Sequence, residues 1–373
     1  MNNRKAILII SLVLIAGLVS GCTAGAGTAS SWPGISSDGE MGYFAYGAEV
    51  FAIDVKNGSL IWRYPANPDA KTQFFAAPAV SEDQVIVGSY NNTLVALDKS
   101  SGSQKWSFNN AKDRYIASPL VTGAIVFAPN TDKYLYALNT AGDLLWSFKT
   151  TGPNWTKPVS DGKFVYLASM DHFLYALNLE YSASALTLDK NGSRTLVEKP
   201  IWSVDLGTAI VADPVLSNGK VLVATIDGKL HSVDTTSGKI AWTFADGDRY
   251  NSIWGSPVVT KEAIYFGNEN GEVFAVSPET GKALWQAPYA AGSAMIAGGI
   301  ATDGGAMFVN QQGKVFSINV AKEPKPVVIL DMVMYATPKS AGDKILLAPA
   351  TKEKLFMAID LSGNEVWSFT PSK

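Results

Sequence analysis

The stretch Ala52-Ile53-Asp54-Val55-Lys56-Asn57-Gly58-Ser59-Leu60-Ile61-Trp62 decides the fold of this chain. Its skeleton, Ala-x-Asp-x-x-x-Gly-x-x-x-Trp, recurs with a period of about 40 residues. Asn or Ser replaces the Asp in some copies, and an insertion splits the fourth copy. Seven tryptophans end these copies: Trp62, Trp106, Trp146, Trp202, Trp242, Trp285 and Trp367. Self-similarity at this period is the signature of a repeat architecture.

Each unit also contains four short apolar segments separated by turn residues. In the second unit these segments are 79–80, 85–88, 94–97 and 106–108. Segments of this length between Gly, Asn, Asp and Ser are typical of antiparallel strands joined by hairpins. Pairs suited to tight hairpins fall between the second and third segments: Asn91-Asn92, Asp227-Gly228, Asn270-Gly271 and Gln312-Gly313.

Four antiparallel strands in about 40 residues form one blade of a β-propeller. We place the starts of eight units at Pro33, Ala77, Ser118, Lys157, Asp213, Ser256, Gly298 and Thr337. The predicted fold class is therefore all-β, an eight-bladed propeller of four-stranded antiparallel blades over residues 33–373. An insertion, residues 180–199, falls between the third and outermost strands of blade four. In unit seven, Gly298 replaces the opening proline and Leu330 stands where the tryptophan is expected.

The repeated residues are expected to have structural tasks. The tryptophan belongs on the outermost strand, wedged against the neighbouring blade, where a buried indole covers ~150–250 Å². The Asp of the motif is expected to accept backbone N–H groups in its turn. Two ways of closing the ring stay open. Either every blade is complete in itself, or residues before Pro33 pair with the last blade near Trp367.

The composition fits one large β domain and argues against nucleic-acid binding. The chain has 373 residues, of which 47% are hydrophobic, with 33 glycines and 18 prolines. Removing the first 21 residues takes away Arg4 and Lys5 and no acidic residue, so the formal charge moves from −3 to −5. Nucleic-acid binding needs clustered Lys and Arg, and no basic run here exceeds two residues.

The N-terminus has the pattern of a bacterial lipoprotein signal. Arg4 and Lys5 precede a 13-residue apolar segment, 6–18, which is short for a membrane-spanning helix. Val19-Ser20-Gly21-Cys22 then resembles a lipobox, the site of lipid attachment. The alternative is an ordinary secretory signal with an incidental cysteine. Cys22 is the only cysteine, so an intrachain disulfide cannot form.

We therefore expect a signal peptide over residues 1–21, a lipidated Cys22, and a flexible tether over residues 22–32. The predicted location is extracytoplasmic and membrane-anchored. It is the outer membrane in a host with two membranes, and the outer face of the plasma membrane otherwise.

No motif in the sequence predicts catalysis or metal binding. The only two histidines, His172 and His231, are expected within strand repeats as packing or surface residues. Two isolated histidines without a cysteine pair lack the spacing of a zinc site. The sequence has neither a Gly-x-Ser-x-Gly elbow nor a phosphate-binding loop. We expect neither a metal nor an enzymatic activity.

The loops between blades carry the predicted binding residues. These loops run from the outermost strand of one blade to the innermost strand of the next and open on one face, the funnel face. They place Arg beside aromatic residues, a composition typical of recognition hot spots. The candidates are Arg114, Tyr115, Trp155, Arg249, Tyr250 and Trp254. Either they bind a peptide segment or a small anionic ligand, or they seal neighbouring blades together.

The repeated unit resembles the pyrroloquinoline quinone (PQQ) repeat, the tryptophan-docking motif of quinoprotein dehydrogenases, over residues 33–369. Those enzymes hold PQQ on the propeller axis with a disulfide of adjacent cysteines, a calcium ion and an Asp base. A chain with one cysteine cannot supply that disulfide, so we expect no cofactor. Eight repeats behind a lipobox resemble the propeller lipoproteins of the outer-membrane β-barrel assembly machinery, and PQQ-like repeat lipoproteins in general.

The favoured functional hypothesis is a non-catalytic lipoprotein scaffold that binds protein partners of the cell envelope, as the resemblance to the β-barrel assembly machinery implies. One alternative is a propeller that binds PQQ or another ligand in its axial funnel. Another is a carbohydrate-binding module of the envelope, since exposed aromatic side chains also suit sugars.

Overall fold

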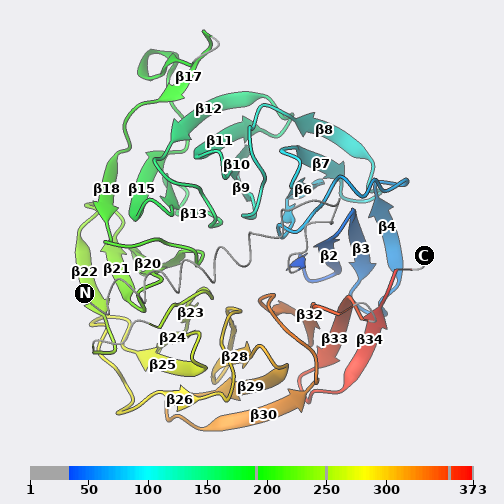
Figure 1. Cartoon of the computed structure of the whole chain (residues 1–373), viewed down its shortest axis with the longest axis vertical. Helices are drawn as coiled ribbons and strands as arrows, with labels where there is room; N and C mark the ends of the chain where they lie inside the picture. Colours follow the sequence, from blue (N-terminus) through cyan, green and yellow to red (C-terminus); the bar gives the residue numbers. More distant parts are fainter. Residues whose placement is uncertain (1–32, 190–191, 248–250, 352–353, 372–373) are drawn as a thin grey trace, which may run out of the picture.

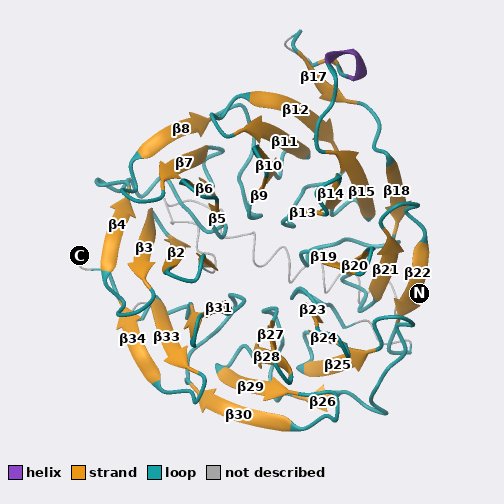
Figure 2. Ribbon diagram, turned by 180° about the vertical axis from the view of Figure 1, so that it is seen from behind, coloured by secondary structure: helices purple, strands orange, loops and turns teal. Residues whose placement is uncertain are grey.

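The computed structural model describes residues 33–189, 192–247, 251–351 and 354–371. These residues form eight antiparallel sheets arranged in a ring, with the innermost strands around the centre and the outermost strands on the rim (Figure 1 and Figure 2). The predicted eight-bladed propeller is confirmed. The signal peptide, Cys22 and the tether, which were predicted within residues 1–32, lie outside the described residues.

The strands follow the chain from blade to blade. Blades one and two contain β1 (Gly34–Ser37), β2 (Met41–Tyr46), β3 (Glu49–Asp54), β4 (Leu60–Tyr64), β5 (Ala79–Val80), β6 (Gln84–Gly88), β7 (Leu94–Asp98) and β8 (Gln104–Phe108). Blades three and four contain β9 (Leu120–Thr122), β10 (Ile125–Pro129), β11 (Tyr134–Asn139), β12 (Leu144–Lys149), β13 (Val159–Ser160), β14 (Phe164–Ala168), β15 (Phe173–Asn178) and β18 (Trp202–Asp205).

The second half of the ring repeats this order. Blades five and six contain β19 (Val215–Ser217), β20 (Lys220–Ala224), β21 (Leu230–Asp234), β22 (Ile240–Phe244), β23 (Val258–Val259), β24 (Ile264–Gly267), β25 (Glu272–Val276) and β26 (Tyr289–Ala290). Blades seven and eight contain β27 (Ile300–Thr302), β28 (Gly305–Val309), β29 (Lys314–Ile318), β30 (Pro324–Ile329), β31 (Lys339–Ala341), β32 (Lys344–Leu347), β33 (Phe356–Asp360) and β34 (Glu365–Phe369).

Burial within a blade explains the sequence pattern of its strands. The second strand of blade two, β6, is buried at all five positions, and β7 is buried at its first four. These middle strands have a neighbouring blade on each face, so they read as continuous apolar runs rather than alternating ones. The rim strand β8 is exposed at Gln104, Lys105 and Ser107, because one edge of it borders solvent.

The ring closes by side-chain packing between complete blades. Blade one contains β1 to β4 and blade eight contains β31 to β34, each in chain order, so between residues 33 and 371 the described strands show no exchange between these two blades. Phe44 of blade one stacks on Phe356 of blade eight, with 4.8 Å between ring centroids. The indole Nε1 of Trp367 donates a hydrogen bond of 2.8 Å to the carbonyl of Val55. The described blades are complete in themselves, as the first of the two predicted closures requires. The residues before Pro33, on which the second closure depends, lie outside the described residues.

The seven motif tryptophans dock on neighbouring blades in the same way. Each indole Nε1 donates to a backbone carbonyl in the turn before the last strand of the next blade, over N···O distances of 2.7 to 3.1 Å. The accepting residue follows the Asp, Asn or Ser of that blade's own motif. The donor and acceptor residues are Trp62 and Lys99, Trp106 and Thr140, Trp146 and Leu179, Trp202 and Thr235, Trp242 and Pro278, Trp285 and Val320, and Trp367 and Val55.

The Gly and the Asp of the motif shape this docking turn. Gly102 has a φ of 70°, and a Cβ at this position would lie 2.6 Å from Cδ2 of Trp62. The position therefore requires glycine both for its left-handed backbone and for the approach of the indole. Asp98 accepts hydrogen bonds from the hydroxyl groups of Ser100 and Ser101 and from their backbone N–H groups. These bonds lower the pKa of Asp98 to about 2. The predicted role of the Asp in locking the turn is confirmed.

The insertion of blade four extends the sheet of blade three. It contains the 3₁₀ turn η1 (Ala183–Ala185), β16 (Thr187–Leu188) and β17 (Arg194–Val197). Strand β17 pairs with the rim strand β12 in parallel, which gives blade three a six-stranded sheet. Leu186 and Val197 are buried against this blade. Figure 1 shows the segment projecting outward from the ring at β17.

Blade seven differs from the sequence-based expectation at two positions. Leu330 follows the end of β30 and does not occupy the tryptophan position. That place is taken by Val327 and Val328, since Gly363 of the next blade lies against the carbonyl of Val327 and the Cβ of Val328. Likewise Gly299, not Gly298, immediately precedes the innermost strand of its blade, as proline does in the other units. This unit has neither the tryptophan nor the opening proline that mark the register of the other units, and the bulge of its third strand lies between Val315 and Phe316.

Candidate functional site

The loops between blades have a repeating pattern of burial on the funnel face. The residue four positions before the opening proline is buried in each described loop, as Phe74, Tyr115, Asn154 and Ile253 illustrate. The residue three positions before it lies beside the innermost strands and is partly exposed in six loops: Ile116, Trp155, Val211, Trp254, Ile296 and Tyr335. Each of these loops leads into an innermost strand, and Figure 2 shows the innermost strands arranged around the centre of the ring.

Arg114 and Tyr115 are neighbours in sequence but have different environments. Tyr115 is 1% exposed, and its ring packs directly against Gly88 of blade two. It is therefore a core residue and is not available on the surface. The Arg114 guanidinium is exposed. Its Nε lies 3.6 Å from Oδ1 of Asp113, and its Cζ lies 5.6 Å from the ring centroid of Tyr90.

Trp155 and Trp254 occupy the same repeat position in different loops, and both are partly exposed. The Nε1 atom of Trp155 is buried without a hydrogen-bond partner among the described residues. Arg249 and Tyr250 lie outside the described residues. The structure thus places Arg114 and Trp155 on adjacent loops of the funnel face, and Trp254 on the same face two blades beyond Trp155.

The sequence Asp-Arg-Tyr occurs at residues 113–115 and again at 248–250. The two copies lie at different positions of the repeat. Tyr115 lies four residues before Pro119, whereas Tyr250 lies seven residues before Pro257. The position equivalent to Tyr115 is Ile253, which is 1% exposed. The distance to the opening proline could have revealed this difference from the sequence alone.

Sequence reasoning missed a carboxylate that ties the loops of the funnel face to the blades. Asp132 accepts the N–H of Lys112 at 2.8 Å and the hydroxyl of Tyr136 at 2.7 Å. In the next blade, Asp171 accepts the N–H of Thr151 at 2.8 Å and the hydroxyl of Tyr175 at 2.8 Å. Each carboxylate therefore joins the incoming loop to the turn between the second and third strands. The Asp-x-x-x-Tyr spacing shared by units three and four could have revealed these carboxylates from the sequence.

Three charged residues from separate blades interact electrostatically near the innermost strands. The backbone N–H of Lys157 donates to Oδ1 of Asp213 over 2.8 Å. Burial raises the pKa of Asp213, although the charges of Lys157 and Lys339 oppose this change. Burial and the charge of Lys157 lower the pKa of Lys339. The hydrogen bond gives Asp213 a structural task in joining blades four and five.

The two histidines have packing and turn positions. His231 lies on β21 and is 4% exposed, and its Nδ1 lies 3.0 Å from Oγ1 of Thr243. Its Nε2 is buried without a partner among the described residues. His172 lies in the turn before β15 with a φ of 80°, rather than within a strand as the sequence suggested. Neither histidine belongs to a described cluster of three or more His, Cys, Asp or Glu side chains with metal-binding geometry.

His231 is expected to make the protein less stable in mild acid. Desolvation lowers the pKa of His231 from 6.5 to about 4, so between these values the unfolded chain binds a proton that the folded chain does not. The free energy of unfolding should therefore fall by about 2 kcal/mol as the pH drops from about 7.5 to about 5. His231→Phe, which inserts the residue type found at Phe274 and Phe316, should remove this part of the slope.

Urea unfolding at pH 7.5, 6 and 5 measures this effect. The matched control is His172→Asn, which changes an exposed histidine and keeps a residue that tolerates positive φ. A wild-type slope that persists in His231→Phe would contradict the role of His231.

Within the described ranges, no helix is long and apolar enough to cross a membrane. The sequence family of the outer membrane protein assembly factor BamB matches residues 46–180 and 187–369. The chain belongs to the BamB family. The gap between the two matched parts falls inside the insertion that carries η1.

Individual relatives agree with this family at low identity. The BamB of Moranella endobia (strain PCIT) is 22% identical over 276 residues, which cover 72% of this chain and 68% of that protein. The crystal structure of BamB from Moraxella catarrhalis has a TM-score of 0.66 at 17% identity, and covers 85% of this chain and 90% of its own. At that identity the structural likeness establishes the fold.

A short segment also resembles an enzyme. The quinohemoprotein alcohol dehydrogenase ADH-IIG of Pseudomonas putida is 38% identical over 77 residues. These residues cover 18% of this chain and 11% of the dehydrogenase. A match of about two blades is what a shared repeat produces, since the repeated residues form the scaffold of both proteins.

Proposed function

We propose that this chain is a non-catalytic scaffold of the cell envelope that takes part in outer membrane protein assembly. The observation that carries the proposal is the BamB family match over residues 46–180 and 187–369, together with the eight-bladed ring. The relatives that match across most of the propeller are described as assembly factors, whereas the dehydrogenase match is confined to 77 residues.

The funnel face supports partner binding in this proposal. The loops between its blades carry the partly exposed side chains of Trp155, Trp254 and Tyr335 on a rigid framework. The exposed Arg114 guanidinium lies on one of these loops. Aromatic and Arg side chains on a pre-formed surface favour protein recognition, because little conformational entropy is lost when they bind. The partner class is a protein component of the β-barrel assembly machinery.

A paired substitution on adjacent loops tests this function. Arg114→Ala combined with Trp155→Ala should reduce co-purification of β-barrel assembly components with the tagged chain by at least about tenfold, which is about 1.4 kcal/mol. The melting temperature should stay within a few degrees of wild type. Ile201→Ala, an equally accessible apolar change away from these loops at 48% exposure, should leave recovery unchanged. Undiminished recovery in the paired variant would refute the assignment of this face.

The proposal also includes a lipid anchor at Cys22 and no resident quinone. Cys22→Ser should move the protein from the membrane fraction to the soluble fraction of the same cells.

Mixing the purified protein with PQQ and calcium should give only the summed absorbance of the components. A specific quinone spectrum accompanied by alcohol oxidation would contradict the scaffold role.

A further inference from the structure

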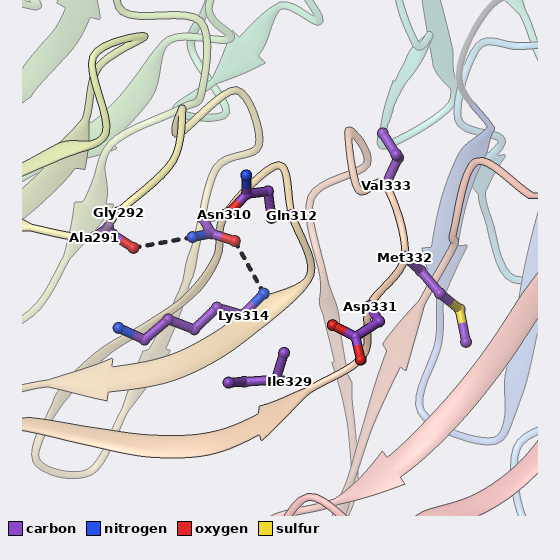
Figure 3. A pocket seen from close by; sticks show the side chains of 9 residues that line it. All are labelled: Ala291, Gly292, Asn310, Gln312, Lys314, Ile329, Asp331, Met332 and Val333. Atoms are coloured by element: carbon purple, nitrogen blue, oxygen red, sulfur yellow. Dashed lines mark hydrogen bonds between the residues drawn. The ribbon is translucent and has the colours of Figure 1, made fainter.

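A cleft of about 490 Å³ opens on the funnel face at blade seven. Its walls come from the loop between blades six and seven, the turn before β29, and the loop between blades seven and eight. Figure 3 shows Asn310, Gln312 and Lys314 on one side, Asp331 and Val333 on the other, and Ile329 between them. The volume is within the range of about 300–1,000 Å³ that holds small ligands or single bulky side chains.

At the cleft, blade seven lacks the carboxylate tie of blades three and four. Gln312 occupies the repeat position of Asp132 and Asp171, and Phe316 occupies that of Tyr136 and Tyr175. The loop residue is Gly292, and a Cβ built on it would meet nothing within 4 Å. In blades three and four the Asp, the Tyr hydroxyl and the loop N–H meet at this place. The cleft of blade seven lies at the equivalent place.

Two of the exposed side chains that line the cleft are apolar. Ile329 is 64% exposed and Val333 is 43% exposed, and Met332 is partly buried beside them. The rim strand β30 carries Pro324 and Pro326, which lack a backbone N–H, so its outer edge offers few donors to an added strand. Recognition at this place therefore depends on side chains entering the cleft rather than on extension of the sheet.

Of the two charged residues that line the cleft, Lys314 is engaged by neighbouring side chains and Asp331 is engaged by none that the structure describes. The Nζ of Lys314 donates to the hydroxyl of Tyr289 over 3.2 Å and lies over the rings of Tyr289 and Phe316. Figure 3 shows this side chain extending away from Asp331. Asp331 has a φ of 50° and is exposed, and the described residues offer it neither an ion pair nor a hydrogen bond. A ligand therefore meets an unpaired carboxylate beside an apolar floor.

We propose that this cleft binds an extended peptide segment of a partner protein in which a large apolar residue is followed by Lys or Arg. The apolar side chain enters over Ile329 and Val333, and the cation reaches Asp331. This inference rests on the proposed scaffold function and adds to it a second contact, distant from Arg114 and Trp155 on the same face.

Fluorescence anisotropy with defined peptides tests the cleft directly. The probe is fluorescein-labelled Gly-Ser-Leu-Arg-Ser-Gly, amidated at its C-terminus, titrated with the purified full-length protein. It should bind saturably, and replacing its Leu by Ala should raise Kd about tenfold, since most of the buried area is lost. Replacing its Arg by Glu should raise Kd at least about fivefold, and the difference should shrink at high salt.

Variants of the chain locate the binding. Ile329→Ala should raise Kd about fivefold or more, and Asp331→Asn should abolish the preference for Arg over Glu while keeping the positive φ that Asn tolerates. The matched control is Leu361→Ala, since Leu361 is an apolar residue that is 63% exposed in the turn before β34. This variant should bind the probe as the wild type does. Absence of saturable binding, equal binding of the Arg and Glu peptides, or equal effects of Ile329→Ala and Leu361→Ala would each overturn the proposal. Arg114→Ala with Trp155→Ala should leave probe binding intact, so failure of the scaffold function and failure of the cleft are distinguishable.

Discussion

Replacing Trp146 with Ala is expected to lower the free energy of unfolding by about 3–5 kcal/mol. Trp146 is 1% exposed, and its ring centroid lies 5.6 Å from that of Phe127 and 5.3 Å from that of Tyr181. Its Nε1 also donates to the carbonyl of Leu179 at 2.9 Å. The substitution therefore opens a cavity between blades three and four and leaves a buried carbonyl without its donor.

Urea unfolding followed by circular dichroism measures this loss. Leu145→Ala is the matched control, because Leu145 is the neighbouring residue of the same strand and is 37% exposed. Its effect should stay within about 1 kcal/mol. A loss below about 1 kcal/mol in Trp146→Ala would show that the two blades hold together without the indole.

Replacing Gly281 with Ala is expected to cost about 2–5 kcal/mol for two separate reasons. Gly281 has a φ of 67°, which disfavours a residue with a Cβ. A Cβ at this position would also lie 2.4 Å from Cε3 of Trp242. The alanine therefore strains the backbone and pushes the docked indole of blade five out of its place against blade six.

Gly219→Ala separates these two costs. Gly219 has a φ of 71°, but a Cβ there would meet nothing within 4 Å. Its replacement should cost about 1–2 kcal/mol, the backbone strain alone. Equal losses of stability in Gly281→Ala and Gly219→Ala would mean that the contact with Trp242 contributes nothing. The comparison uses the same unfolding measurement for both variants.

The architecture could be predicted from the sequence because the repeated residues have steric duties that do not depend on the partner or host. Gly102 must be glycine under the indole of Trp62, and Asp98 must cap its own turn. Such residues recur at fixed spacing, so seven copies of the motif and one degenerate unit predicted eight blades. Blade seven lost the tryptophan, and with it the marker that fixes register. That is why Leu330 was assigned to a place that Val327 and Val328 occupy.

The candidate site was harder to predict, since exposure depends on where a residue lies in the repeat. Tyr115 is a residue type that is common on recognition surfaces, but it lies four residues before a proline. At this position the side chain is buried in every described loop. Strand β17 pairs with a blade that precedes it in the chain, and no local pattern specifies such a partner. At the cleft of blade seven, the sequence differs from units three and four by having Gln312 at the repeat position of Asp132 and Asp171. This difference becomes visible once the units are aligned in space.

The joint between blades eight and one has a consequence for how such rings change size. Six of the eight sheets are each folded from an uninterrupted segment, the exceptions being those of blades three and four, which the insertion links. Duplication or loss of the gene segment for one of these six therefore adds or removes a whole sector and leaves no strand without its partner. The new neighbours need only an indole on one side and a glycine turn with a free carbonyl on the other, as Trp367 and the turn at Val55 already provide. Recombination between repeats can therefore produce rings of different diameter from the same parts.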